Sequence, residues 1–302
     1  MKESEIIRTL FGTTPPPEDD CYFLAPNRLV TTDSLSEGTH FLHDWSSPEI
    51  LAKKLVEVNV SDIIASGGNP KECFLNLGLS PLSRKKEWIR AFSKELRKSL
   101  NQYGMKLAGG DTFSASKTQL TLTVVGTVEK PWLRSGGKPG DYLYITGSLG
   151  QSQLGYHCLR KKKREKKYKE AIERHLSPNS RFMVFPYLQN FRINACMDIT
   201  DGLIQDAERL AHASHGKLKI QMESLPLDPL ALAELGLDLC LGSGEELELL
   251  FLSPDILPTK LAGVPVTMVG RLEKGKPGIQ FKKEGKTYLP KSKGFLHFSE
   301  EE

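Results

Sequence analysis

The sequence predicts an α/β (α+β) protein that is built from two domains. Its 302 residues are enough for two domains of about 150 residues each. Short apolar segments alternate with longer amphipathic segments, as strands and helices do in mixed α/β folds. A segment dense in glycine, LRSGGKPGDYLYITGSLG at 133–150, predicts a hinge followed by a new strand. We therefore expect an N-terminal domain over residues 1–136 and a C-terminal domain over residues 137–302.

The N-terminal half is expected to contain two helices and three strands. A helix over 47–68 begins at Ser47 with Pro48 in its first position, and two glycines end it. A second helix, over 83–104, has an apolar residue at every fourth position: Trp88, Phe92, Leu96 and Leu100. The expected strands are 27–35, a buried strand over 105–112 and a half-buried strand over 118–130.

The C-terminal half is expected to alternate strands with helices. The expected strands are 142–147, 195–200, 218–222 and 267–274, and the expected helices are 150–175, 178–191 and 203–214. The late strand TMVGRLEK at 267–274 resembles TVVGTVEK at 123–130 in the first half. A match this short is consistent either with chance or with two related halves.

The composition argues against export and against a membrane span. No apolar run approaches the ~18 residues that a spanning helix needs, and the opening MKESEIIRTLFG lacks the apolar core of a signal peptide. The five cysteines are far apart, and none forms a CxxC pair: Cys21, Cys73, Cys158, Cys196 and Cys240. This usage favours reduced thiols over disulfides or zinc. We therefore expect a cytoplasmic protein that does not bind membranes.

The net charge of +4 is modest, and much of it lies in RKKKREKKYK at 160–169. This run lacks the interleaved aromatic residues of a protein that binds single-stranded nucleic acid. We interpret it as a solvated helix face or loop and expect no nucleic-acid partner.

Aspartates recur at the ends of the expected strands and helices. Asp198 and Asp201 flank Thr200 at a strand-to-helix junction, where something must offset their repulsion. Other aspartates occupy similar places: Asp19, Asp20, Asp33, Asp62 and Asp111. One such aspartate taken alone is usually an N-cap or a turn former. Asp62 differs because apolar residues surround it, and a carboxylate in a buried helix needs a cation or several donors.

A set of carboxylates without matching arginines points to divalent cations and phosphate. Magnesium prefers oxygen ligands and is commonly held by carboxylates together with substrate phosphates. Thr31, Thr32 and Thr200 could add hydroxyl groups, and the glycines of AGGDT and TDGL would let backbone N–H groups approach a phosphate. The chain has no GxxxxGK[ST] sequence and no HRD or DFG motif, which excludes an ordinary P-loop and a protein-kinase site.

Seven motifs follow one another between about residues 18 and 298. They are DDC, TTDSLSEGTHF, NVSDIIASGGNP, YGMKLAGGDT, LRSGGKPGDYLYITGSLG, MDITDGLIQD and GSGEELELLF. In this order they resemble the thiamine-monophosphate kinases, a family of the aminoimidazole ribonucleotide synthetase superfamily. Each motif alone is weak, but seven at compatible spacing are specific.

The resemblance implies two α/β domains, of which the first binds ATP and magnesium and pairs with its counterpart in a homodimer to form a β-barrel. It also implies ATP-dependent phosphorylation of thiamine phosphate to thiamine diphosphate. ATP and thiamine phosphate would then be the small-molecule substrates, and several Mg²⁺ ions the cofactor.

The resemblance also implies roles for residues that match the family's motifs. The implied metal ligands are Asp20, Thr31, Thr32, Asp33, Asp62, Asp111, Asp198 and Asp201. The implied nucleotide contacts are Tyr103, Gly110, Asp111, Arg134 and Thr200. The implied contacts to thiamine phosphate are His40, Glu245 and Phe295, with ordinary core packing as the alternative for His40 and Phe295.

The acceptor that the resemblance implies makes a catalytic base unnecessary. A phosphate monoester has a second pKa near ~6, so its attacking oxygen is already anionic at neutral pH. Repulsion between the two substrates' phosphates is then the obstacle, and metal ions would offset it while holding the phosphates in line. We therefore expect no catalytic histidine or lysine.

The chain departs from the family pattern at three positions. Glu18 stands where the family usually has glycine, Glu246 replaces aspartate, and Leu247 replaces tyrosine. Two alternatives therefore stay open: another enzyme of the same superfamily, or a non-catalytic protein that binds magnesium nucleotide or thiamine diphosphate.

Overall fold

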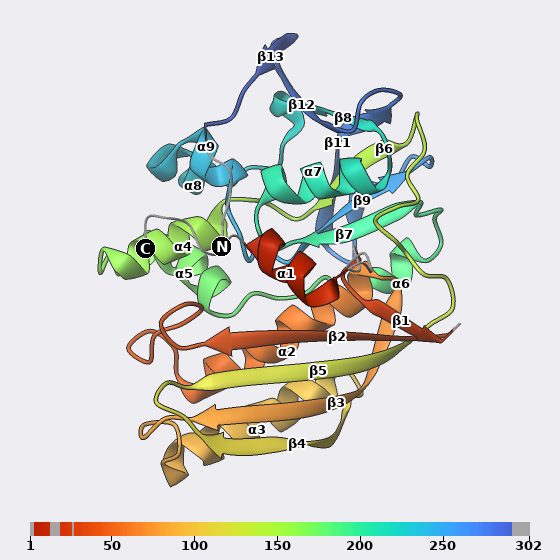
Figure 1. Ribbon diagram of the computed structural model, residues 1–302. Helices are drawn as coiled ribbons and strands as arrows, with labels where there is room; N and C mark the ends of the chain where they lie inside the picture. The colour runs from red at the N-terminus through yellow and green to blue at the C-terminus, as the bar shows by residue number, and fades with distance from the viewer. Residues whose placement is uncertain (1–2, 13–18, 26, 292–302) are drawn as a thin grey trace.

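The structure, a computed structural model, describes residues 3–12, 19–25 and 27–291. A short helix α1 precedes a sheet of five strands in the order β1-β2-β5-β3-β4, with α2 and α3 behind it (Figure 1). The bounds are α1 Glu3–Phe11, β1 Tyr22–Ala25, β2 Arg28–Ser36, α2 Pro48–Ala65, β3 Gly68–Leu79, α3 Lys86–Gln102, β4 Lys106–Ser114 and β5 Gln119–Val128.

Both predicted helices of this half are present. Ser47 caps α2, and its Oγ accepts a hydrogen bond from the backbone N–H of Ile50 at 3.4 Å. Gly67, at φ +78°, then lets the chain turn back into β3. In α3 the four apolar residues at steps of four are buried against α2 and the sheet. Gly104, at φ +63°, follows the end of this helix.

The predicted strands of this half also form, but one of them is not buried. Strand β5 alternates between buried and half-buried residues, as expected for a strand with one covered face. Strand β4 is exposed along its whole length, so the expectation of a buried strand over 105–112 is wrong. Within the described part of the chain it pairs with β3 alone and forms one edge of the sheet. Strands β1 and β3 are additional to the three expected strands.

The second sheet is larger, with strands in the order β13-β12-β8-β11-β6-β9-β7 and β10 paired to β11. The strand bounds are β6 Tyr142–Thr146, β7 Ala195–Ile199, β8 Lys217–Gln221, β9 Glu248–Ser253, β10 Lys260–Leu261, β11 Val264–Glu273, β12 Gly278–Lys283 and β13 Lys286–Tyr288. The helix bounds are α4 Gln151–Arg160, α5 Lys169–Leu176, α6 Phe185–Leu188, α7 Leu203–Ala213, α8 Pro229–Leu235 and α9 Leu237–Leu241. The four predicted strands and the helix over 203–214 are confirmed.

Two predicted helices are shorter than expected. The segment 150–175 contains two helices, α4 and α5, because the chain leaves the helical region at Lys162, where φ is +55°. The segment 178–191 forms only the four-residue helix α6. The basic run 160–169 falls between α4 and α5, where most of its side chains are exposed, as predicted.

Helix α2 lies between the two sheets. Its apolar residues share one core cluster with Tyr144 and Phe251 on the near face of the second sheet. The far face of that sheet packs against α7 in a separate cluster. Alternation along β7 directs Cys196 and Asp198 toward α2 and Met197 toward α7. Within the described parts of the chain, each helix is too short or too polar to span a bilayer.

Candidate functional site

Helix α2 carries a stripe of polar side chains through the core. Lys54, Glu57 and Ser61 are buried at positions i, i+3 and i+7, which lie on one face of a helix. A buried polar group is costly unless it is bonded, and each of these reaches a partner in the C-terminal half. Lys54 Nζ lies 2.8 Å from Glu245 Oε2, Glu57 Oε2 accepts from Ser180 N–H at 2.7 Å, and Ser61 Oγ donates to Asp198. The helix therefore positions groups of both halves.

Three aspartates meet beside this stripe. Asp20 precedes β1, Asp62 lies in α2, and Asp198 lies in β7; one carboxylate oxygen from each falls within 4.8 Å of the others. Thr31 Oγ1 donates a hydrogen bond of 2.6 Å to Asp62 Oδ2, and Ser61 fixes Asp198. The result is a compact set of hard oxygen donors of the kind that divalent cations prefer.

The protonation of these aspartates reflects their crowding. Burial raises the pKa of Asp62 well above its usual range, and repulsion from Asp33, Asp198 and Asp20 raises it further. Burial and then Asp20 raise the pKa of Asp198 in the same way. Three crowded buried carboxylates either hold protons or need positive charge between them, so their environment fits a cation.

Arg134 closes one side of the aspartate cluster. Its guanidinium donates to Asp20, which offsets part of the rise in the pKa of Asp20 that burial causes. Its backbone N–H donates to Asp19 Oδ1 at 2.7 Å, and its carbonyl accepts from Ser214 Oγ at 2.7 Å. The guanidinium Nε is buried and has no acceptor among the described residues. That donor remains for a ligand, as a contact to a nucleotide phosphate requires.

Asp33 extends the negative region along β2. Its backbone N–H donates to Asn59 Oδ1 on α2 at 3.0 Å, which fixes this part of the strand. Burial, followed by repulsion from Asp20, Glu245 and Asp201, raises the pKa of Asp33 to about 6. The Asp33 carboxylate is therefore affected by the negative charges of both the aspartate cluster and Glu245.

The turn after β7 is held by Asp206, a residue that the sequence did not single out. Its buried Oδ2 accepts hydrogen bonds of 3.1 Å from the backbone N–H groups of Thr200, Asp201 and Gly202. Burial and then repulsion from Asp201 raise the pKa of Asp206 to about 7. Arg209 pairs with Asp201 at 2.6 Å and with Asp206 at 2.9 Å. Asp201 is thus at the rim of the cluster, with Arg209 as its present counterion.

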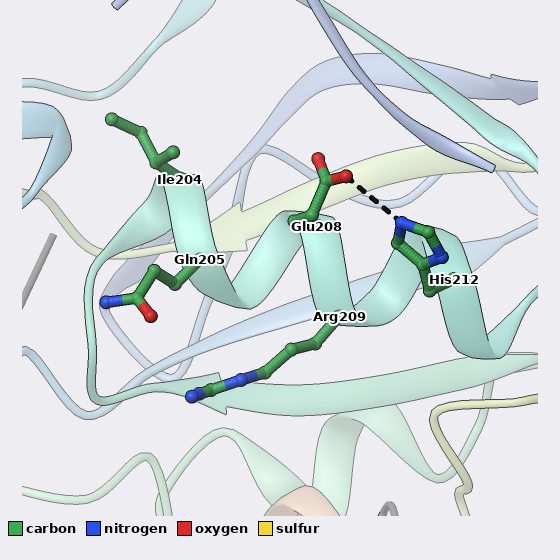
Figure 2. A pocket seen from close by; sticks show the side chains of 5 residues that line it. All are labelled: Ile204, Gln205, Glu208, Arg209 and His212. Atoms are coloured by element: carbon green, nitrogen blue, oxygen red, sulfur yellow. Dashed lines mark hydrogen bonds and ion pairs between the residues drawn. The ribbon is translucent and has the colours of Figure 1, made fainter. Parts of the chain in front are cut away.

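A cavity of about 410 Å³ lies along α7 next to this ion pair. Figure 2 shows the Arg209 side chain on the opposite side of α7 from the Glu208–His212 pair. The lining residues are Ile204, Gln205, Glu208, Arg209 and His212. Arg209 therefore connects this cavity to the acidic turn.

The loop before β9 brings Glu245 to the site. Glu245 N–H donates to Thr200 O at 2.8 Å, so the loop lies against the turn after β7. Burial alone would raise the pKa of Glu245, but the charge of Lys54 outweighs it, and the pKa of Glu245 lies below its usual value. His40 also acts on Glu245, and its Nδ1 accepts from the backbone N–H of Ser36 at 3.0 Å. The two predicted acceptor contacts, His40 and Glu245, are therefore close enough to interact electrostatically.

Other predicted site residues lie apart from the cluster within one chain. Thr32 directs its Oγ1 to Thr123 on the outer face of the sheet, at 3.0 Å. Gly110 and Asp111 lie on β4, three strand spacings from β2, or roughly 14 Å across the sheet. Tyr103 Oη donates a hydrogen bond of 2.6 Å to Glu57 Oε1, one turn of α2 before Ser61. Phe295 lies outside the described residues.

Comparisons with known proteins identify the family. Residues 18–128 match the AIR synthase related protein, N-terminal domain, and residues 138–274 match the AIR synthase related protein, C-terminal domain. A thiamine-monophosphate kinase from Leptospira interrogans is 46% identical over 99% of this chain and 98% of that protein. The chain belongs to the thiamine-monophosphate kinase family. The structure of AaThiL complexed with AMPPCP and TMP has a TM-score of 0.87 at 31% identity, covering 98% of this chain and 97% of that one. That of thiamine monophosphate kinase from Aquifex aeolicus has a TM-score of 0.83 at 31% identity, covering 95% and 96%.

Two of the three departures from the pattern of the thiamine-monophosphate kinases are buried residues. Glu246 is fully buried, and its carboxylate accepts from the N–H groups of Gly150 and Ser152 at 2.7 and 3.2 Å and from Ser243 Oγ at 2.6 Å. It therefore caps the N-terminus of α4. Leu247 is also fully buried. Glu18, the third, lies outside the described residues.

Proposed function

We propose that the aspartate cluster of this thiamine-monophosphate kinase holds magnesium ions, and that it is the place where a phosphoryl group passes from ATP to thiamine phosphate. The reaction gives thiamine diphosphate in one direct transfer. The observation that carries the proposal is the convergence of Asp20, Asp62 and Asp198, whose carboxylate oxygens lie within 4.8 Å.

The residues present fit several magnesium ions. Asp20, Asp62 and Asp198 offer hard oxygen donors at one point, and Asp33 and Asp201 offer more on either side. Bound magnesium would neutralise the phosphates of the two substrates and hold them in line. AaThiL, which this chain resembles in fold and sequence, is complexed with AMPPCP and TMP.

The chain's own cations and dipoles complete the nucleotide side. The unsatisfied Nε of Arg134 can donate to an anionic oxygen beside Asp20. Arg209 can move from Asp201 to a phosphate once another cation neutralises Asp201. The turn at Thr200 leads into α7, and the N-terminus of this helix also favours anions.

The acceptor side needs no general base from the protein. The attacking oxygen of thiamine phosphate is anionic near neutral pH because its second pKa is about 6. The task of His40 and Glu245 is then to bind and orient the organic part of the acceptor, so that its phosphate points toward the aspartates.

We propose further that the protein acts as a homodimer, through the edges of the first sheet and the face that no described helix covers. That face exposes Leu24 and Phe74 beside a hollow of about 490 Å³, and β4, which exposes Phe113, has no further strand beside it among the described residues. An open edge and an apolar face of this kind favour pairing with a second copy. Such pairing would bring Asp111 of the partner subunit toward β2, which explains why Asp111 lies far from the cluster of its own chain.

The direct test follows thiamine diphosphate by chromatography. Purified protein is incubated with ATP, Mg²⁺ and thiamine phosphate, and thiamine diphosphate is expected only when all three are present. Calorimetric titration with thiamine phosphate and with an ATP analogue runs in parallel. Binding of both ligands without product would replace the kinase proposal by that of a non-catalytic binder.

A further inference from the structure

Lys54 is an unusual residue for its position. Its side chain is 3% exposed in the middle of α2, where the neighbouring residues Leu51, Leu55 and Val58 are buried core residues. An ammonium group removed from water needs a hydrogen-bonded counterion, because its hydration is otherwise lost. The apolar neighbours of Lys54 supply no reason for an ammonium group at this position.

The counterion of Lys54 lies in the other half of the chain. Lys54 Nζ is 2.8 Å from Glu245 Oε2, and His175 Nδ1 lies 3.7 Å from the same oxygen. Among the described residues, both side-chain contacts of this carboxylate are made by Oε2, and the Glu245 side chain is 29% exposed. The buried end of the pair is therefore positive and the accessible end negative, with Oε1 left for a ligand.

His175 adds no second positive charge to this pair at neutral pH. It is half-buried beside Lys54, its Nδ1 lies 3.3 Å from Ser152 Oγ, and burial with the charge of Lys54 lowers its pKa to about 4. A ligand that reaches Glu245 therefore meets a carboxylate with one buried counterion. That environment suits an organic cation or an amino group that donates hydrogen bonds.

The backbone beneath Glu245 is strained and depends on support. Glu245 and Leu247 have φ values of +53° and +51°, a region that costs non-glycine residues roughly 1–3 kcal/mol each. Hydrogen bonds from their N–H groups to Thr200 O and Ile199 O, at 2.8 and 3.0 Å, hold this shape. The C-terminal half thus fixes the backbone, whereas the orientation of the carboxylate depends on Lys54 of the N-terminal half.

We propose that Lys54 is a positioning residue of the acceptor site, which holds the Glu245 carboxylate oriented so that Oε1 receives the cationic, amino-bearing ring system of the acceptor. This inference rests on the proposed function, in which Glu245 binds thiamine phosphate. Lys54 acts through Glu245 and touches neither phosphate nor metal. It also makes the acceptor site dependent on the contact between α2 and the loop before β9.

The test compares Lys54→Met with Lys53→Met, a neighbouring lysine of the same helix that is only half-buried. Lys54→Met is expected to raise the KM for thiamine phosphate about tenfold and to leave the KM for ATP within about twofold. Lys53→Met should leave both unchanged. An equal rise in both KM values, or an unchanged KM for thiamine phosphate, would overturn the proposal.

Glu245→Gln supplies the background that separates positioning from a general structural role. In that background Lys54→Met should raise the KM for thiamine phosphate by less than about twofold, because the carboxylate through which it acts is gone. A full tenfold effect there would mean that Lys54 works by another route, and the proposal would be wrong.

Two further measurements keep the outcome clear. Calorimetric binding of thiamine phosphate to the wild type and to Lys54→Met needs no turnover, so it tests Lys54 even if the kinase reaction itself is not observed. Lys54→Gln, which keeps a hydrogen-bond donor, should bind thiamine phosphate more tightly than Lys54→Met. If both variants are unfolded at the assay temperature, Lys54 is a structural residue and the proposal fails.

Discussion

Ser61 of α2 donates a hydrogen bond to Asp198 of β7, and this contact joins the N-terminal half of the chain to the second sheet at the aspartate cluster. The next residue along the helix, Asp62, presents its carboxylate to the same point. Neither segment makes the cluster alone. It is assembled by the packing of one buried helix against one buried strand, and Asp20 joins it from the segment before β1. Its geometry therefore depends on the core around it.

The aspartates of this cluster should be essential for turnover but not for folding. Asp62→Asn and Asp198→Asn are each expected to lower kcat by roughly a hundredfold or more, because each removes an anionic metal ligand. The Mg²⁺ concentration that gives half-maximal activity should rise, and the circular dichroism spectrum should be unchanged. Asp44→Asn, at an exposed aspartate, is the control. Full activity in either variant would remove that residue from the site.

Binding of magnesium should stabilise the protein more at neutral than at acidic pH. Burial, followed by repulsion from Asp20, Glu245 and Asp201, raises the pKa of Asp33 from 3.8 to about 6. A carboxyl with a raised pKa binds protons more tightly when folded, so its contribution to metal-free stability falls as pH rises from about 4 through about 6. Above this window the carboxylate is free to bind a cation, and below it protons compete.

The measurement is the rise in Tm on adding Mg²⁺. At saturating Mg²⁺ and about pH 7.5 we expect a rise of roughly 5 °C, and at about pH 5 a much smaller one. Potassium chloride of equal ionic strength controls for screening, and Asp33→Asn should reduce the difference between the two pH values. Equal shifts at both pH values would contradict a cation site built on these carboxylates.

The parts of this site that the sequence could predict are those with a local signature. Asp62 stands out as a carboxylate within an apolar helix, and Asp198 and Asp201 stand out at a glycine turn. The repeated four-residue spacing of apolar positions in α3 has the same local character, and this helix was predicted closely. In each case the informative residues are neighbours along the chain.

The parts that escaped prediction depend on contacts between distant segments. The stripe of Lys54, Glu57 and Ser61 is visible as an i, i+3, i+7 pattern, but nothing local says that Glu245 and Asp198 face it. Asp206 looks like an ordinary first-turn acidic residue of a helix until its three backbone partners are seen. Strand β4 reads as a buried strand, but whether an edge is covered depends on the order of strands in the sheet.

Glu246 should matter for stability and not for acceptor binding. Its buried carboxylate caps α4 and pairs with Arg174 at 3.4 Å, and Arg174 also pairs with Glu248 at 2.5 Å. Glu246→Gln therefore weakens the cap of α4 and removes one of the two counterions of Arg174. We expect the free energy of unfolding to fall by about 2 kcal/mol in denaturant titrations. The KM for thiamine phosphate should change less than about twofold. Glu129→Gln, at an exposed residue, is the control, and a large KM change without loss of stability would contradict this role.

The basic run 160–169 should be dispensable for catalysis. Lys163 and Lys167 pair with Glu234 at 3.4 and 2.8 Å and lie over the ring of Tyr168. They therefore link the connection between α4 and α5 to Glu234 on α8. Replacing Lys161, Lys162 and Lys163 together by glutamine should leave kcat and both KM values unchanged, with at most a small fall in Tm. A large loss of turnover would show that the run contacts a substrate or the catalytic core.

The uncovered face of the first sheet should be the dimer interface. Phe113 on β4 is 47% exposed, and an aspartate there would place a charge in an apolar contact. We expect Phe113→Asp to elute as a monomer in size-exclusion chromatography and to lose most of its turnover, because Asp111 of the partner subunit would no longer reach the cluster. Leu232→Asp, at a residue that is 40% exposed on α8, is the matched control and should remain dimeric and active. A wild-type protein that sediments as a monomer while fully active would contradict the interface, and a monomeric but active Phe113→Asp would separate the interface from the site.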